Sequence, residues 1–212
     1  MKYQGIIFDL DGVICSTDEY HYRAWKALAD RLNIPFDREI NNRLRGVSRM
    51  ESLEIILEKS SKTYTQEEKL AFADEKNMLY RELLGNMSTA DLTDEVRHTL
   101  SSLRAQGAQL AIGSSSKNTP FILDRIGLGG YFDAVADGNC ITHSKPHPEV
   151  FLTAADMLGL QPTACLVVED AHAGVEAAVA GGFDCAAIGD AYGDVRAKWH
   201  LNSFDDLCKI LS

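Results

Sequence analysis

The sequence predicts an α/β protein with a Rossmann-like core of parallel strands and an inserted α-helical cap domain. Short apolar runs alternate with amphipathic helical segments over most of the chain, which is typical of a parallel sheet covered by helices on both faces. The first apolar run, Gly5–Phe8, is separated from the later ones by residues 16–88, which have a helical period and no strand pattern. We therefore expect residues 1–15 and 89–212 to form the core and residues 16–88 to form the cap.

Three helices are expected in the cap, because three capping boxes precede amphipathic segments. The boxes pair Ser16 with Glu19, Ser48 with Glu51, and Thr65 with Glu68. Gly85 is a plausible stop for the third helix. An insertion after the first strand lies over the carboxyl end of the sheet, where open α/β folds bind ligands, so it is expected to act as a lid.

The core pattern begins after residue 88. Helices are expected over residues 94–107, 118–126, 150–158, 173–182 and 204–211. Strands are expected over residues 108–113, 132–136, 164–170 and 185–189.

Composition excludes several classes of function. The chain has 212 residues, a formal net charge of −10 and a pI of about 5.0, which disfavours nucleic acid and anionic membranes as partners. Its apolar runs are too short to span a bilayer, and the start of the chain does not resemble a signal peptide. The five cysteines are scattered without a C-x-x-C pair, which indicates reduced thiols and a cytoplasmic location.

Charged and hydroxyl side chains stand at the carboxyl ends of four predicted strands. They are Asp9 and Asp11, the run Ser114, Ser115 and Ser116, then Lys145, then Glu169 and Asp170. Strands of a parallel sheet end along the same edge, so we expect these groups to meet. Four carboxylates together require a cation, and oxygen ligands suit Mg²⁺. The serines, helix-start N–H groups and Lys145 would hold a phosphate.

This arrangement suits phosphoryl transfer. One aspartate can attack phosphorus, and a neighbouring carboxyl can carry a proton to and from the substrate oxygen. The spacing alone does not decide which aspartate has which role. Each motif by itself also has a simpler explanation as a turn, a loop or a helix start, and only their combination indicates a site.

Four segments of the chain resemble the four motifs of the haloacid dehalogenase superfamily of phosphotransferases. They are "FDLDGVI", "GSSS", "SKPHPE" and "VVEDAHAGVEAAVAGG". The resemblance covers nearly the whole chain, and the predicted insertion matches the position of the family's cap. Within the superfamily, segments such as "EYHYRAWKALA" and "LRGVSRMESL" are similar to mutases that act on glucose phosphates.

The resemblance implies a role for each matching residue. Asp9 would be the phosphorylated nucleophile and Asp11 the general acid and base. Mg²⁺ would be held by Asp9, the Asp11 carbonyl and Asp170, with Glu169 beside it. Ser114 and Lys145 would bind the transferring phosphate, and Arg49, Ser116 and Asn118 a distal phosphate. The implied substrate and cap residues are Thr17, His21, Trp25, Gly46, Val47, Ser52, Lys76 and Ser115.

The implied activity is a Mg²⁺-dependent mutase that interconverts β-D-glucose 1-phosphate and glucose 6-phosphate through a bisphosphate. A sugar-phosphate phosphatase using the same aspartates is the first alternative, and a non-catalytic receiver-type module is the second. The substrate would be a small phosphosugar, and nothing in the sequence calls for more than a monomer. Cys140, His143 and His147 show no evident fourth ligand, so we do not expect a zinc site there.

Overall fold

A computed structural model, which describes residues 2–211, confirms the α/β fold. Its sheet has six parallel strands in the order β3-β2-β1-β4-β5-β6. The strands are β1 (Gly5–Phe8), β2 (Gln109–Gly113), β3 (Ala134–Ala136), β4 (Cys165–Glu169), β5 (Asp184–Ala187) and β6 (Trp199–His200). The central strands β1, β2 and β4 are almost entirely buried, as expected of a parallel sheet with helices on both faces.

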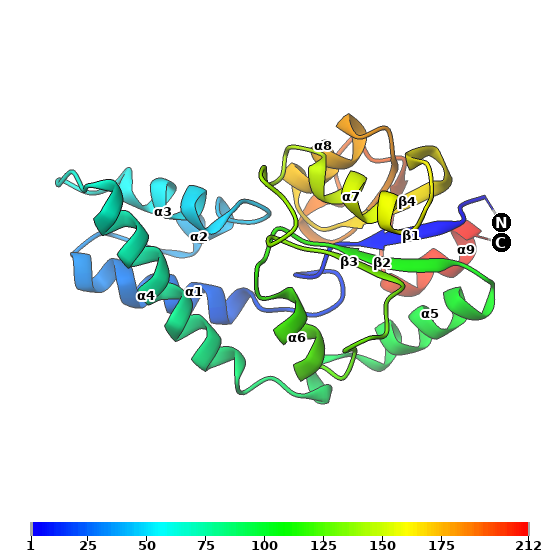
Figure 1. The fold of residues 1–212 in the computed structure, drawn as a ribbon, viewed down its shortest axis with the longest axis horizontal. Helices are drawn as coiled ribbons and strands as arrows, with labels where there is room; N and C mark the ends of the chain where they lie inside the picture. Colours follow the sequence, from blue (N-terminus) through cyan, green and yellow to red (C-terminus); the bar gives the residue numbers. More distant parts are fainter. Residues whose placement is uncertain (1, 212) are drawn as a thin grey trace.

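Side chains of successive residues in each strand enter opposite layers of the core. In β1, Ile6 and Phe8 join one apolar cluster, whereas Ile7 joins the other. The first cluster includes residues of α5, α6 and α9, and the second includes residues of α7 and α8. These helices are α5 (Asp94–Ala105), α6 (Thr119–Arg125), α7 (Glu149–Met157), α8 (His172–Ala180) and α9 (Leu207–Leu211). Figure 1 shows the two groups on opposite faces of the sheet.

The first four helices after β1 form the cap beyond one end of the sheet (Figure 1). They are α1 (Asp18–Leu32), α2 (Arg38–Asn42), α3 (Arg49–Leu57) and α4 (Gln66–Leu84). The cap has its own apolar cluster, which includes Trp25, Leu53 and Ile56. Tyr80 and Leu84, near the end of α4, pack instead into the core cluster. The domain bounds at residues 15 and 88 remain a prediction.

Two of the three capping boxes are confirmed and one prediction is wrong. Ser48 and Thr65 each exchange hydrogen bonds with the glutamate three residues later, and α4 ends at Gly85. Helix α1, however, begins after Thr17 rather than Ser16 and has no side-chain cap. The Thr17 hydroxyl and N–H both donate to Asp11, so neither residue 16 nor 17 caps this helix.

A short α-helix and a short strand were not predicted. Helix α2 has five residues and follows the N-cap Asp37, whose carboxylate accepts the N–H of Ile40. Strand β6 has two residues, too few for a period to be read from the sequence. The predicted last helix is present, but its first turn, Phe204–Asp206, is a 3-10 helix.

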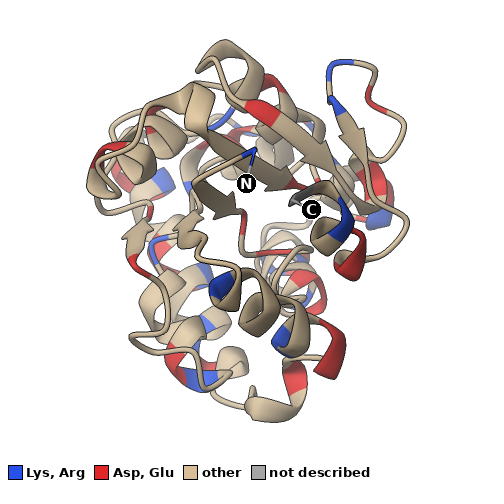
Figure 2. Ribbon diagram, turned by 90° about the vertical axis from the view of Figure 1, so that its right-hand side faces the viewer, with Lys and Arg blue, Asp and Glu red and all other residues tan. Residues whose placement is uncertain are grey.

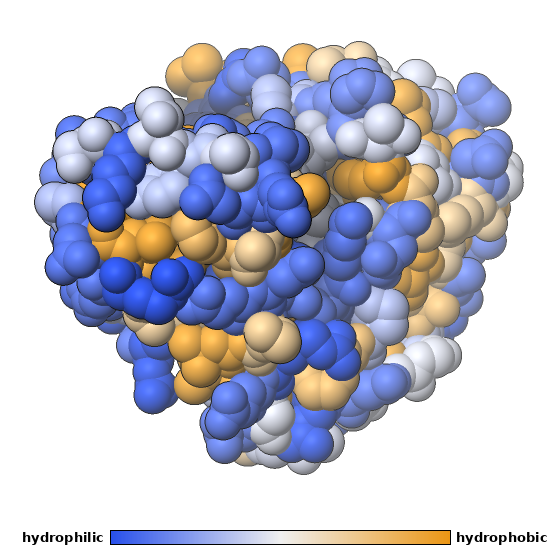
Figure 3. Space-filling model, turned by 60° about the vertical axis from the view of Figure 1, so that its left-hand side comes forward, coloured by the Kyte–Doolittle hydropathy of each residue, from blue (hydrophilic) through white to orange (hydrophobic). Residues whose placement is uncertain are grey.

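The surface offers no extended basic or apolar face in the views drawn. Figure 2 shows basic and acidic residues interspersed over the ribbon. Figure 3 shows hydrophobic side chains in separate patches between hydrophilic ones on the cap side. Among residues 2–211, no helix has the length and apolarity that a membrane crossing requires.

Candidate active site

The ends of β1 and β4 and the loop before α7 bring charged groups together in what we call the core floor: Asp9, Lys145, Glu169 and Asp170. The Lys145 ammonium lies 2.5 Å from Asp9 Oδ1 and 2.5 Å from Glu169 Oε1. Its side chain is fully buried between the two carboxylates. Glu169 Oε2 accepts the N–H of Ala171 at 2.7 Å. The floor is therefore a fixed, charge-paired arrangement.

The floor still has more negative than positive charge. Burial raises the pKa of Asp9 to about 7, with Lys145 opposing and Glu169 reinforcing the rise. Burial and the neighbouring Glu169 raise the pKa of Asp170 to about 9. Burial alone would lower the pKa of Lys145, but Asp9 and Glu169 together raise it. One lysine does not balance three buried carboxylates.

The surplus carboxylates fit a divalent cation. Asp9, Glu169 and Asp170 each offer an oxygen atom, and these atoms lie within 4.8 Å of one another. Oxygen-only donors suit hard cations. The backbone leaves room for this group, since Gly12 has φ +81° and a Cβ there would lie 2.0 Å from Asp170 Oδ2. The Asp11 carboxylate does not belong to this trio, because it faces the cap.

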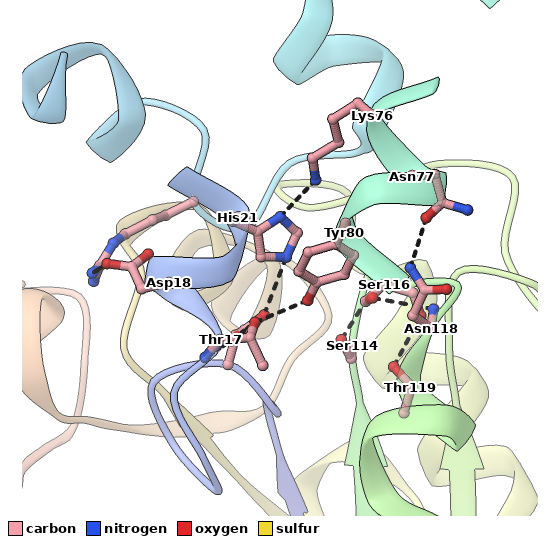
Figure 4. Close-up of polar contacts among 12 residues, drawn as sticks. Thr17, Asp18, His21, Lys76, Asn77, Tyr80, Ser114, Ser116, Asn118 and Thr119 are labelled. Carbon is pink, nitrogen blue, oxygen red and sulfur yellow. Dashed lines mark hydrogen bonds and ion pairs between the residues drawn. The ribbon is translucent and has the colours of Figure 1, made fainter. Parts of the chain in front are cut away.

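Asp11 is held by a hydrogen-bonded chain that runs into the cap. Its Oδ1 accepts the N–H of Thr17 at 2.8 Å and the Thr17 hydroxyl, which in turn accepts from Tyr80 at 3.0 Å. His21 Nε2 lies 3.6 Å from Asp11 Oδ2, and His21 Nδ1 lies 2.9 Å from the Lys76 ammonium nitrogen. Figure 4 shows His21 between Lys76 and Thr17. This chain fixes the position of Asp11.

The chain also sets protonation states. Burial would raise the pKa of Asp11, but the contacts of His21 and Thr17 outweigh it and lower that pKa. Burial and the positive neighbour Arg49 hold the pKa of Lys76 well below its usual range. Burial and Lys76 lower the pKa of His21. Asp11 is therefore ionised at neutral pH and ready to accept a proton.

Between floor and cap lies a cavity of about 530 Å³, a size typical of small-molecule sites. Its walls contain most of the predicted site residues, from both domains. These are Asp9, Asp11, His21, Trp25, Gly46, Val47, Arg49, Ser52, Lys76, Ser114, Ser115, Ser116, Glu169 and Asp170. We call its cap side, formed by Trp25, Arg49, Ser52 and Lys76, the cap roof.

Arg49 is the first residue of α3, directly after the Ser48 cap. Burial lowers the pKa of its guanidinium, and the charge of Asp74 opposes this effect. Among the described residues, none forms a hydrogen bond or an ion pair with the Arg49 side chain. A half-buried cation with free donors facing a cavity is suited to bind an anion.

Three predicted residues lie outside the cavity wall. Thr17 and Lys145 act behind it, through Asp11 and Asp9. Asn118 is buried at the start of α6, and its side chain is bonded to two α4 residues, with its amide 2.9 Å from Asn77 Oδ1 and its Oδ1 3.1 Å from Arg81. Its N–H donates to Ser116 Oγ at 3.2 Å. The structure thus joins Asn118 to α4 rather than to the cavity.

Two site residues were missed by the sequence analysis. Tyr80 lies one helical turn after Lys76, a spacing that places both on one face of α4. Arg45 of the cap lies 2.5 Å from Asp18, 3.3 Å from Asp170 and 2.7 Å from Asp190. No local pattern predicts this contact, since Asp190 is 145 residues away.

Comparison with known proteins identifies the family of the chain. The chain matches the family model described as haloacid dehalogenase-like hydrolase over residues 3–182, and it belongs to this family. It is 40% identical over 206 residues to a beta-phosphoglucomutase of Bacillus subtilis (strain 168), covering 96% of this chain and 91% of that one. It is 32% identical to a fructose-1-phosphate phosphatase of Escherichia coli (strain K12), covering 88% and 97%.

A solved structure gives the same result. The crystal structure of a beta-phosphoglucomutase from Clostridium difficile superposes with a TM-score of 0.91 at 35% identity, covering 97% of this chain and 93% of that one. The family and these relatives identify the chain as an enzyme of phosphoryl transfer.

Proposed function

We propose that the enzyme interconverts β-D-glucose 1-phosphate and glucose 6-phosphate through a phosphorylated Asp9 and a glucose bisphosphate. One observation carries the proposal: groups suited to bind an anion lie at both ends of the cavity. Ser114, with Lys145 behind the wall, lies at the floor, and Arg49, which has no ion pair among residues 2–211, lies at the roof. A bisphosphate requires two such sites at once. The similarity to two beta-phosphoglucomutases supports the choice of sugar.

The reaction follows from the two aspartates. The phosphoryl group on Asp9 passes to a sugar hydroxyl, while the Asp11 carboxylate takes the proton of that hydroxyl. The bisphosphate then exchanges its ends in the cavity. Its other phosphoryl group returns to Asp9, and Asp11 gives its proton back to the sugar oxygen. Asp11 suits this role because His21 and Thr17 lower its pKa and fix its position.

Asp9, Asp170 and Glu169 are the residues that would hold Mg²⁺, together with the Asp11 carbonyl. When bound, the ion supplies positive charge for the phosphoryl oxygens that gain negative charge during transfer. The positive charge of Lys145 pairs with the carboxylates of Asp9 and Glu169 behind the cavity wall. Ser114 faces the same end of the cavity and would donate to the transferring phosphate.

The cap would exclude water from phospho-Asp9, which hydrolysis would otherwise destroy. Further hydrogen bonds join the cap to the core at the cavity edge. Ser115 donates to the Gly46 carbonyl at 3.3 Å, and the Ser144 hydroxyl donates to Glu51. Arg45 adds ion pairs from the cap to Asp170 and Asp190. These contacts support a closed state during each transfer.

Sugar-phosphate hydrolysis is the second candidate, and the similarity to the fructose-1-phosphate phosphatase favours it. It needs the same floor, but water replaces the sugar as the final acceptor. A phosphatase acting on a monophosphate requires no second anion site. Arg49 therefore distinguishes the two.

The test is an incubation of the enzyme with β-glucose 1-phosphate, Mg²⁺ and a trace of β-glucose 1,6-bisphosphate, with glucose 6-phosphate and inorganic phosphate both measured. We expect glucose 6-phosphate to form with little free phosphate. We expect Arg49→Ala to reduce this turnover by about 10- to 100-fold, the effect of one lost hydrogen bond to a charged group. Hydrolysis of a small phosphate ester should change far less.

Arg43→Ala is the matched control, because Arg43 lies on the same cap and is paired with Glu58 at the surface. It should leave both activities near wild type. Asp9→Asn should abolish both. Mainly inorganic phosphate from the wild type would exclude the mutase. Equal losses of both activities in Arg49→Ala would exclude the role given to Arg49.

A further inference from the structure

A second group of metal-ligating side chains lies outside the cavity, on the loop between β3 and α7. His143 and His147 lie on either side of Lys145, and Glu149 is the first residue of α7. Lys145 enters the core floor and is fully buried. The histidine side chains are instead 65% and 52% exposed. The same loop therefore faces the active site at one residue and solvent at its neighbours.

The three side chains meet at one point. His143 Nδ1 lies 3.0 Å and His147 Nδ1 lies 3.9 Å from Glu149 Oε2. The two imidazole centroids are 4.7 Å apart. One ligand atom from each residue lies within 4.8 Å of the other two. This is the spacing of groups that can share one ion.

The ligand atoms are also held in place by backbone hydrogen bonds. The N–H groups of Thr142 and His143 each donate to Glu149 at 2.8 Å, which fixes the carboxylate beside the two imidazoles. The N–H of Glu149 donates to His147 Nδ1 at 3.3 Å, which fixes the orientation of this imidazole beside the carboxylate. The backbone hydrogen bonds explain the position of the Glu149 carboxylate. They do not explain why two exposed histidine side chains lie beside it.

We propose that His143, His147 and Glu149 form a second metal site, for a transition-metal dication such as Zn²⁺. Two imidazoles with one carboxylate are ligands typical of zinc, with a further position open to water. Mg²⁺ prefers oxygen ligands and suits the floor instead. The two sites thus differ in metal because their donor atoms differ. Zinc was not predicted here from the sequence, because the two histidines were grouped with Cys140 and not with Glu149.

The location gives this site a link to the cap. A shallow hollow on the core–cap border contains His143, Ser144 and His147 from the core and Ser48 and Glu51 from the cap. Ser144 donates to Glu51 across this border. A dication at the histidines adds positive charge beside the Glu51 carboxylate. The proposed ion therefore lies next to a contact that joins the cap to the core.

The experiment is a calorimetric titration of the full-length enzyme with Zn²⁺ in saturating Mg²⁺, which keeps the floor occupied. We expect one Zn²⁺ per chain that added Mg²⁺ does not displace. His143→Gln and His147→Gln should each weaken binding by about 100-fold or more, because loss of a supporting partner alone weakens metal sites roughly 10- to 100-fold. Both histidines are exposed, so the variants should fold normally, which circular dichroism checks.

His98→Gln is the matched control. His98 is also exposed, and its Nδ1 lies 2.7 Å from the Asp94 carbonyl oxygen on α5, so this variant should bind Zn²⁺ like the wild type. In nuclear magnetic resonance spectra, Zn²⁺ should shift the imidazole signals of His143 and His147 but not that of His98. The proposal would be wrong if both cluster variants bound Zn²⁺ with unchanged affinity. It would also be wrong if added Mg²⁺ displaced the Zn²⁺ bound to the wild type.

Discussion

Among residues 2–211, two lysines are buried, one in the core floor and one in the cap roof, and their surroundings are opposite. Lys145 lies between Asp9 and Glu169, which raise its pKa despite burial. Lys76 contacts His21 and the rings of Trp25 and Tyr80, and burial together with Arg49 lowers its pKa. The lysine ammonium is thus paired with carboxylates in the floor, whereas in the roof its positive charge is disfavoured by burial and by Arg49.

This difference shows how the two regions divide the work. The floor needs fixed charges around the nucleophile, so its groups pair with one another. In the roof, the Arg49 guanidinium has no ion pair among residues 2–211, and the pKa of the Lys76 ammonium is lowered. An anion that enters the cavity stabilises both positive charges. A phosphorylated substrate supplies this anion. The floor is therefore preorganised for chemistry, whereas the roof is completed by the substrate.

The largest effect on stability is expected from Lys145→Met. It leaves two buried carboxylates without their counter-charge, and breaking such a pair lowers the free energy of unfolding by about 3–5 kcal/mol. Urea unfolding without Mg²⁺ measures it. Lys69→Met, which removes a surface pair with Glu54, should change stability by less than about 1 kcal/mol. Similar losses in both variants would mean that the floor is not specially paired.

Binding of Mg²⁺ should stabilise the folded chain next most strongly. A ligand at 100 times its dissociation constant adds about 2.7 kcal/mol, which a thermal scan with and without Mg²⁺ detects. Asp170→Asn removes one carboxylate of the trio and should abolish most of the shift. Asp190→Asn is the control, because Asp190 also contacts Arg45 but lies outside the trio. A shift that survives in Asp170→Asn would place the cation elsewhere.

The smallest effect is a change in pH dependence in Lys76→Met. The pKa of Lys76 is lower in the folded chain than its ordinary value of 10.5, so the folded state binds fewer protons between these two values. Lys76 should therefore contribute stability that grows as pH rises through this interval, by up to about 1.4 kcal/mol per pH unit. The raised pKa of Asp170 acts in the opposite sense in both proteins, so the stability of the wild type should rise relative to that of the variant. Urea midpoints from neutral pH to pH 10.5 measure it. The variant should lack this gain, and parallel curves would contradict the lowered pKa.

The sequence predicted the site residues best where they end a strand. Asp9, Ser114 and Asp170 each follow a buried apolar run, and parallel strands must end at one edge. Contacts between domains were not predicted. The ion pair of Arg45 with Asp190 joins residues far apart in the chain, and the bonds of Asn118 to Asn77 and Arg81 depend on how α4 lies against α6.

The sequence by itself determined the order of strands and helices, the position of the insertion and the acidic edge of the sheet, because periodicity and strand-end residues are local. Only the tertiary structure decided that Thr17 holds Asp11 instead of capping α1, that Arg49 faces the cavity unpaired, and that Glu149 joins the two histidines. These features depend on which groups approach one another after folding. Hydrogen bonds and charges act over a few ångströms, and chain spacing does not fix such distances.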